Sequence, residues 1–464
     1  MTKQDLYSLL QGRMSDLTAL SDSIWGFAEL SLQEYRSAAC LADFLENEGF
    51  TVERGIAGIE TAFCASFGSG KPVIGLLAEY DALDGLQQEA GAMYPCGSGG
   101  CGHGCGHHLL GVGSVGAALA VKAYLEEKGE GCGTVELYGC PGEEGLASKA
   151  FMAREKLFAH LDAALSWHPG DENRVFTGSN QTSLQVLYTF HGIASHAAET
   201  PHMGRSALDA VELTNIGVQF LREHMPRTDS VHYAITNTGG VSPNVVQPEA
   251  AVLYMVRSDT VPHAKDLLAR VDKIAQGAAL MTETTLARRF LDGTADIVPN
   301  AVLEQLLYNN LVEAPAPVYT AEEQRYAAAL YATYPHSDSP QPIHEGVVPY
   351  VHSDEHDYGS SDVGDVSWLT PTSQILTVTY PAGSPGHSWQ NVAIGKHSVA
   401  HKGMIYAAQV LGCTVVDLFE DPTLLTAARN EWQQRTAAGP HRPASQQFPA
   451  PIRHLTVERP VGLF

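Results

Sequence analysis

The fold is decided by the stretch PVIGLLAEYDAL, residues 72–83, which opens with a short apolar run bounded by proline, glycine and acidic residues. Such a run is typical of a strand that is buried on both faces, as in a parallel sheet. The stretches TVELYGC (134–140) and DAALSW (162–167) have the same character, and helices are expected near 109–128 and 146–158. This alternation predicts a parallel sheet covered by helices.

A different pattern begins at residue 183. A strand-helix-strand-strand-helix-strand series is expected, and its first five segments are 183–192, 205–224, 230–238, 249–258 and 263–280. This order is typical of a small α+β unit of the ferredoxin-like kind. The stretches 373–380 and 392–411 then predict one more strand and one long helix of the first fold. The α+β unit is therefore expected to be an insertion.

The chain is thus predicted to be an α/β protein with a mixed, mostly parallel sheet and an inserted α+β domain. The main domain is expected to take residues 1–183 and 299–437, and the inserted domain residues 184–298. Residues 438–464 are rich in proline and are expected to be irregular. Residues 311–358 allow no assignment.

Length and charge restrict the class of protein. The 464 residues include 52 acidic and 28 basic side chains, and the net charge of −24 argues against a general electrostatic grip on nucleic acid or an anionic membrane. The N-terminus lacks the apolar core of a secretory signal, and the most apolar stretch, Leu109 to Val121, is too short to span a bilayer. Eight cysteines in such a chain favour metal binding or catalysis in the reducing cytosol over disulfides.

The densest cluster of chemically active residues is CGHGCGHH, residues 101–108. Glycines let the backbone bend so that neighbouring side chains converge, and thiolate and imidazole suit zinc and related ions. Two other interpretations stay open for this motif: a flexible glycine-rich loop, or a structural zinc site that uses Cys96, Cys101 and Cys105.

Three further motifs follow predicted strands. Glu143 and Glu144 follow 134–140, His168 ends the strand near 162–167, and His387 follows 373–380. Taken singly, the paired carboxylates are also explained by a helix cap and each histidine by an ordinary hydrogen bond. Open α/β sheets build their sites at the carboxyl ends of strands, so the four motifs together predict a metal site.

Other residues are candidates for supporting roles. Asp81 ends the first strand with Glu79, where it can orient a metal ligand or cap the chain. In the inserted domain, His196, Asn244 and Arg257 can bind a carboxylate and stabilise an oxyanion, or they are ordinary surface polar residues.

These motifs resemble, in the same order, those of the aminoacylase/carboxypeptidase superfamily of dinuclear metallohydrolases, in its amidohydrolase branch. The resemblance covers roughly residues 5–440. The motifs that carry it are GHGCGHH (102–108), PGEEG (141–145), SWHPG (166–170), SHAA (195–198), GRSALDA (204–210), PNVV (243–246) and GHSW (386–389). The resemblance implies a zinc-peptidase-like catalytic domain with an inserted lid domain that also forms a dimer.

The resemblance also implies a ligand set for two divalent ions, Mn²⁺ or Zn²⁺. Cys105 is expected to bridge the two ions. His107 and His168 are expected to complete the protein ligands of one ion, and Glu144 and His387 those of the other.

Roles for the remaining residues follow from the same resemblance. Glu143 is expected to be the general base. Asp81 is expected to lie next to His107 and to orient it without binding a metal itself. His196, Asn244 and Arg257 match lid residues that reach a substrate carboxylate or oxyanion, with His196 crossing from a partner subunit. The branch usually has Asp or Asn where this chain has His108, which is expected to be structural.

The implied reaction is hydrolysis of an amide that joins an aromatic or other acyl group to glutamate, in the cytoplasm. Other N-acyl amino acids or peptides are the alternative substrates. Two alternatives remain open: a subunit that works only with a related A subunit, and a zinc-stabilised structural protein. The presence of Glu143 and of all five candidate ligands argues against a purely scaffolding protein. A homodimer formed through the lid is expected, with no nucleic-acid or membrane partner.

Overall fold

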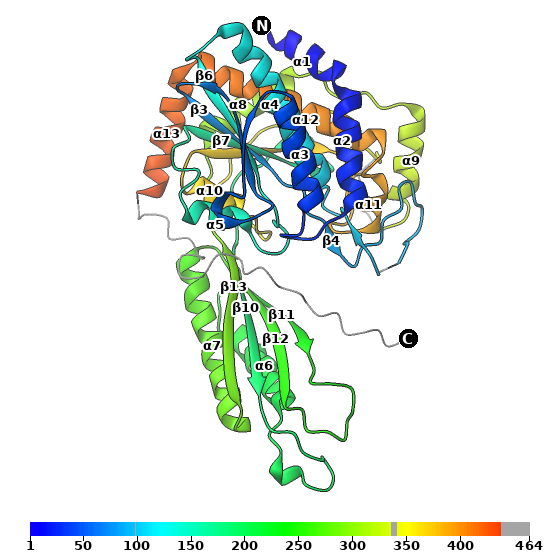
Figure 1. Ribbon diagram of the computed structural model, residues 1–464, viewed down its shortest axis with the longest axis vertical. Helices are drawn as coiled ribbons and strands as arrows, with labels where there is room; N and C mark the ends of the chain where they lie inside the picture. Colours follow the sequence, from blue (N-terminus) through cyan, green and yellow to red (C-terminus); the bar gives the residue numbers. More distant parts are fainter. Residues whose placement is uncertain (98, 336–340, 438–464) are drawn as a thin grey trace.

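Four neighbouring parallel strands form the centre of the main sheet (Figure 1). The structure, a computed structural model, describes residues 1–97, 99–335 and 341–437. The central strands are β6 (Gly133–Gly139), β3 (Val73–Ala78), β7 (Ala163–Gly170) and β15 (Thr372–Val378). Three antiparallel neighbours extend the sheet: β1 (Thr51–Arg54), β2 (Phe63–Ser69) and β8 (Arg174–Val175). The predicted α/β class with a mixed, mostly parallel sheet is confirmed.

Two long apolar helices pack against the main sheet and form much of the core. These are α4 (His107–Lys128) and α12 (Ser398–Glu420), which pack against each other. Both are long and apolar enough to cross a membrane, but 89% and 83% of their most apolar windows lie buried inside the protein. The burial of these helices identifies them as core helices.

The contact between α4 and β7 sets the positions of His107 and His168, two of the residues predicted to bind metal. Gly113 lets the indole of Trp167 lie directly on α4, because a Cβ at this glycine would come within 2.6 Å of the ring. The indole Nε1 of Trp167 also donates to the carbonyl oxygen of Leu110 at 3.0 Å. This close packing holds His168 on β7 opposite His107 at the start of α4.

A second sheet extends away from the main sheet (Figure 1). Its four antiparallel strands have the order β11-β12-β10-β13. They are β10 (Thr182–His191), β11 (Ser230–Asn237), β12 (Glu249–Ser258) and β13 (Thr285–Thr294). Helices α6 (Ala207–Arg222) and α7 (Val261–Thr282) cover one face, against the apolar residues Leu184, Val186, Tyr188 and Phe190 of β10. The division of the chain into domains at residues 184 and 298 stays a prediction.

The remaining elements surround the two sheets. The further helices are α1 (Lys3–Gly12), α2 (Met14–Phe27), α3 (Tyr35–Asn47), α5 (Ser148–Arg154), α8 (Ala301–Glu313), α9 (Ala321–Tyr331), α10 (Val363–Ser367), α11 (Trp389–Ile394) and α13 (Pro422–Thr436). Short strands are β4 (Leu83–Asp84), β5 (Cys101–Gly102), β9 (Ser179–Asn180) and β14 (His356–Asp357), and two 3-10 turns are η1 (Ile56–Gly58) and η2 (Pro201–Met203).

Two helix predictions need correction. The single helix predicted over 392–411 is two helices, because His397 caps a new helix through a bond from the Val399 amide to its Nδ1 atom. The helix predicted over 146–158 is shorter, since α5 covers only 148–154. The unassigned region 311–358 contains α9 and β14, and the predicted tail at 438–464 lies outside the described residues.

Candidate metal centre

The predicted ligands meet at the carboxyl ends of the central strands. Strands β3, β6, β7 and β15 run parallel, so the segments that follow them reach the same edge of the sheet. The start of α4 lies at this edge as well. The side chains gathered there are Glu79, Asp81, Cys105, His107, Glu143, Glu144, His168 and His387.

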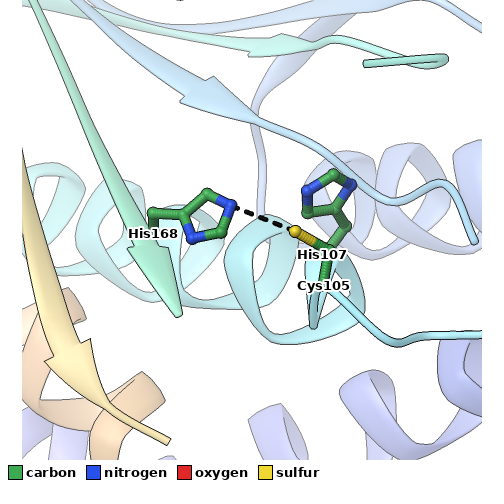
Figure 2. Close-up of side chains that lie close together, drawn as sticks. All are labelled: Cys105, His107 and His168. Atoms are coloured by element: carbon green, nitrogen blue, oxygen red, sulfur yellow. Dashed lines mark hydrogen bonds between the residues drawn. The ribbon is translucent and has the colours of Figure 1, made fainter. Parts of the chain in front are cut away.

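One group of donor atoms contains Cys105, His107 and His168 (Figure 2). The Cys105 Sγ lies 3.4 Å from the His168 Nε2, and the donor atoms of all three lie within 4.8 Å of one another. The other ring nitrogen of His168, Nδ1, lies 2.7 Å from the carbonyl oxygen of Pro169, which directs Nε2 toward the thiol.

A second group contains Cys105, Glu144 and His387. The His387 Nε2 lies 3.3 Å from the Glu144 Oε1, and these atoms again lie within 4.8 Å of the Cys105 sulfur. His387 has a φ of 52°, a left-handed conformation that is uncommon for a non-glycine residue and is typical of functional sites. Cys105 belongs to both groups, which is the arrangement that a bridging ligand requires.

Asp81 orients this cluster from behind. Its Oδ1 lies 2.7 Å from the Nδ1 of His107, and its Oδ2 accepts the backbone N–H of Glu144 at 2.9 Å. The Asp81 carboxylate therefore directs the His107 Nε2 toward the donor group and fixes the segment that carries Glu143. A carboxylate behind a histidine ligand commonly sets its tautomer.

Glu79 is a donor that the sequence analysis left as a cap or an orienting residue. Its Oε2 lies 3.3 Å from the His107 Nε2, and it forms a third group with His107 and Glu143. Glu79 and Asp81 flank Tyr80 just after β3. Side chains two residues apart in an extended segment lie on the same side, so the position of Glu79 relative to Asp81 was the signal that could have identified it.

Lys149 and Asp362 complete a buried ion network that the sequence analysis missed. The Lys149 Nζ lies 2.7 Å from the Glu79 Oε1 and 2.5 Å from the Asp362 Oδ1, and all three side chains are buried. Lysines are almost never fully buried without a charged partner. The sequence signal that could have revealed this network is a single lysine, Lys149, within the apolar stretch where α5 begins.

Burial and neighbouring charges shift the proton affinities of this cluster. Burial raises the pKa of Cys105, and the Glu144 charge adds to this. Burial also raises the pKa of Glu143, with a further contribution from Glu79. Burial lowers the pKa of His168. For His107, burial lowers the pKa, but Cys105 and Asp81 outweigh it and the net shift is upward.

The donor set fits divalent cations. The buried atoms His107 Nε2, Glu144 Oε1 and Glu79 Oε2 lie 3.3 Å from other donor atoms of the cluster, but none of them makes a hydrogen bond of good geometry within the described part of the chain. Buried polar atoms are costly to leave unpaired, so these three atoms point to a bound ion. Sulfur, imidazole and carboxylate together suit zinc and, less specifically, manganese.

A cleft of about 920 Å³ opens beside this centre. One wall carries Cys105, Glu143 and His387, and the opposite wall is the open face of the second sheet. Arg257 of β12 lines this wall, and its Nη1 donates to the Ser360 hydroxyl at 2.9 Å. The structure thus brings Arg257 to the predicted site.

His196 and Asn244 lie elsewhere. Both are exposed and neither lines the cleft. They are neighbours, because His196 pairs with Val245 in an isolated bridge and the carbonyl of Asn244 accepts the Ala197 N–H at 2.9 Å. The structure brings these two residues together but does not bring them to the metal centre of the same chain.

The remaining cysteines and histidines of 96–108 face other partners. The His108 Nε2 lies 3.0 Å from the Gly395 carbonyl, and the centre of its ring lies 4.7 Å from that of His103, with the two rings tilted by 51°. The Cys96 thiol is directed to Glu89 at 3.4 Å. Among the described residues, no group able to hold a metal contains Cys96 or Cys101, so the structural zinc interpretation finds no support.

The fold and the centre together define a metallohydrolase of the peptidase type. Residues 75–347 match Peptidase family M20/M25/M40, and the chain belongs to this family. The predicted superfamily resemblance is thereby confirmed.

Among the relatives, the B subunit of p-aminobenzoyl-glutamate hydrolase from Escherichia coli (strain K12) is 44% identical over 94% of this chain and 96% of its own length. Xaa-Arg dipeptidase of Mus musculus is 27% identical over 90% of this chain and 89% of its own. A solved structure of a Klebsiella pneumoniae aminobenzoyl-glutamate utilization protein has a TM-score of 0.59 at 17% identity, over 86% of this chain and 98% of that one.

Proposed function

We propose that this protein is a metal-dependent amidohydrolase that cleaves p-aminobenzoyl-glutamate to p-aminobenzoate and glutamate. The observation that carries the proposal is the cleft, which brings Glu143, two donor groups that share Cys105, and Arg257 to one space. The relative of 44% identity, whose name states this hydrolysis, supports the choice of substrate.

Two divalent ions, Mn²⁺ or Zn²⁺, are proposed for the centre. Cys105, His107 and His168 would hold one ion, and Cys105, Glu144 and His387 the other. A solved Bacillus subtilis structure, described as a dinuclear metal binding peptidase of the M20 family, shares the fold at a TM-score of 0.56 and 17% identity, over 88% of this chain and 99% of that one. When bound, such ions supply Lewis acidity that polarises a carbonyl and makes water more acidic.

Glu143 is proposed to move the proton. Burial raises the pKa of its carboxyl group above the ordinary value, which favours a carboxylate that accepts a proton during the reaction. It would take a proton from the attacking water and deliver it to the leaving amine nitrogen of glutamate. Arg257 would bind a glutamate carboxylate with its planar pair of N–H donors.

His196 and Asn244 are proposed to act at the cleft of a partner subunit. They are exposed at a distance from their own cleft, as a contribution to a second chain requires. There His196 would donate to the developing oxyanion, and Asn244 would bind substrate. This role needs a homodimer formed through the inserted domain, and a related A subunit would be an additional partner. The proposed compartment is the cytoplasm.

The experiment that tests the function measures release of p-aminobenzoate. The chain is purified alone, stripped of metal, reloaded with Mn²⁺ or Zn²⁺, and given p-aminobenzoyl-glutamate beside other N-acyl amino acids and an Xaa-Arg dipeptide. Release that Glu143→Ala abolishes, without loss of bound metal, supports the proposal. Two ions bound with no release from p-aminobenzoyl-glutamate, but cleavage of another substrate, would replace the substrate and keep the mechanism.

A further inference from the structure

The wall of the cleft opposite the metal centre is a regular array of side chains. On the open face of the second sheet, each of the four strands directs two alternating residues into the cleft. These pairs are Ser183 and Gln185 of β10, Ser230 and His232 of β11, Met255 and Arg257 of β12, and Asp292 and Thr294 of β13. The array therefore faces any substrate bound at the centre.

Strand register orders this array into two rows. Ser183 lies beside Arg257 on one side and Thr294 on the other, which forms the first row. Gln185 lies between Met255 and Asp292, which forms the second row. Arg257 and Asp292 are thus separated both by one strand and by one row, and they place opposite charges at two different points of the same wall.

Asp292 is a carboxyl group without a counter-ion. It is only 4% exposed, yet it lines the cleft, and its Oδ2 accepts the Gln185 Nε2 at 3.1 Å. In the ranges 1–97, 99–335 and 341–437, no lysine, arginine or histidine forms an ion pair with it. Burial raises the pKa of Asp292 to about 7, which the bond from Gln185 opposes and the charge of Asp362 reinforces.

The surrounding strand positions Asp292 for contact with a ligand. The pairing of β10 with β13 shifts register between Gln185 and Val186, next to the pair that Gln185 makes with Asp292. Such irregularities re-aim side chains beside functional sites. A buried carboxyl group that touches a cleft and has one neutral partner is stabilised when a ligand supplies a further N–H donor.

We propose that Asp292, held by Gln185, determines specificity by accepting a hydrogen bond from an N–H donor on the acyl part of the substrate. This inference rests on the proposed function, in which that donor is the aromatic amine of the p-aminobenzoyl group. The open face of the second sheet then determines which acyl groups the enzyme accepts.

Charge decides which end of the substrate lies at Asp292. The glutamate part carries two carboxylates, which Arg257 attracts and Asp292 repels. The acyl part is uncharged and carries the amine. The amine therefore lies toward the second row of the wall, while a glutamate carboxylate lies toward Arg257. A site that holds a buried acceptor for an N–H group rejects an analogue that lacks this group, because the acceptor is then left unpaired.

The test compares p-aminobenzoyl-glutamate with benzoyl-glutamate, which lacks only the amine. The ratio of the two kcat/KM values is measured for the metal-loaded wild-type protein and for Asp292→Leu, so that the intrinsic reactivity of each amide cancels between the proteins. At pH 8, where Asp292 with its pKa of about 7 is mostly ionised, we expect Asp292→Leu to lower this ratio by about 10-fold to 100-fold, as expected for loss of a hydrogen bond to a charged group. Benzoyl-glutamate should be cleaved as fast as before or faster.

Two further variants protect the test against a folding artefact. Asp292→Asn keeps the shape of the side chain and should lower the ratio about fivefold, because a neutral acceptor replaces a charged one. The matched control is Asp296→Asn, which alters another buried aspartate near the end of β13 that hydrogen-bonds Thr182 and does not line the cleft. This control should leave the ratio unchanged.

The possible outcomes separate the inference from the function on which it rests. Suppose that the wild-type protein cleaves p-aminobenzoyl-glutamate, but Asp292→Leu and Asp292→Asn slow the cleavage of both substrates equally. Asp292 then does not bind the amine, so the inference is wrong while the proposed function stands. If the wild-type protein cleaves benzoyl-glutamate but not the amino substrate, or cleaves neither, both proposals are overturned.

Discussion

The Nζ atom of Lys149 lies 2.7 Å from the Oε1 of Glu79, and both side chains are buried beside the metal centre. The other oxygen of Glu79 lies 3.3 Å from the His107 Nε2. Lys149 also contacts Asp362, so one buried ammonium group holds two carboxylates. This network fixes a carboxylate next to a candidate metal ligand.

Loss of Lys149 should destabilise the protein strongly. Lys149→Met removes the ammonium partner of Asp362 and leaves Glu79 with only its contact to His107. Removal of one partner of a buried ion pair typically costs about 3 to 5 kcal/mol. We expect a reduction of this size in the free energy of unfolding in urea, followed by tryptophan fluorescence of the metal-loaded protein.

The matched control for Lys149 is Lys71→Met. Lys71 pairs with Asp162 at 3.0 Å, but its side chain is 64% exposed. Exposed ion pairs contribute less than about 1 kcal/mol, so this variant should unfold at nearly the urea concentration of the wild-type protein. Equal small losses in both variants would contradict a special role for the buried network.

The central strands were predictable because parallel strands buried on both faces appear as continuous apolar runs. Glu79 and Lys149 were not recognised as partners, since a charged residue at a strand end and another in a short helix look like solvated side chains. Their partnership depends on the packing that brings the start of α5 to the segment just after β3, which no local pattern encodes. Asp292 was missed for the same reason, because only the meeting of the two sheets turns its face of β13 into a cleft wall.

Substitution of Cys105 should remove metal from both halves of the centre. Its sulfur belongs to both donor groups, so Cys105→Ser takes a ligand from each. Substitution of a residue that only hydrogen-bonds to a ligand already lowers metal affinity by about 10-fold or more. We therefore expect loss of Cys105 itself to lower metal affinity by more than about 10-fold. Equilibrium dialysis followed by elemental analysis measures the metal content. Cys132→Ser, which alters an exposed cysteine, is the control and should bind metal normally.

The same cysteine should make metal binding dependent on pH. Burial raises the pKa of Cys105, so the metal-free protein holds a neutral thiol near pH 7. Thiolate is the form that binds metal, hence binding releases a proton and affinity increases as the pH rises. Calorimetry in buffers of different ionisation enthalpy should detect this proton in the wild-type protein and one proton fewer in Cys105→Ser. Equal proton release in both proteins would contradict Cys105 as a ligand.

Asp292 should lower the stability of the protein as the pH rises. The pKa of its carboxyl group is about 7 in the folded chain and near 4 in the unfolded chain. Between these values the unfolded state binds fewer protons than the folded state, so the free energy of unfolding falls from about pH 4 to about pH 7. Asp292→Asn removes this titration. We expect the urea resistance of the variant relative to the wild-type protein to be greater at pH 8 than at pH 5. An equal difference at both pH values would show that Asp292 does not titrate in this range.

The meeting of the candidate ligands at one edge of the sheet was predictable from sequence for a physical reason. Each lies directly after a strand or at the start of a helix, so local spacing already brings it to one sheet edge. The lid residues behave differently. Arg257 lies on a strand that reaches the cleft, whereas His196 and Asn244 lie in loops away from the cleft of their own chain, and the proposed target of these loops is a second chain. Sequence spacing within one chain carries no information about that arrangement.

Two inactive variants should restore activity when combined. If His196 acts at the cleft of a partner, His196→Ala keeps its own Glu143 but deprives the partner of the oxyanion donor, and Glu143→Ala has the opposite defect. In a mixed dimer, the cleft that retains Glu143 receives an intact His196 from the other chain. Random pairing of equal amounts makes half of the dimers mixed, each with one complete cleft, so about one quarter of wild-type activity should return. Subunits are exchanged in dilute urea, and release of p-aminobenzoate is followed over time. Activity that stays at the level of the separate variants, while labelled chains are shown to have exchanged, would place the action of His196 within its own chain or remove it from the reaction.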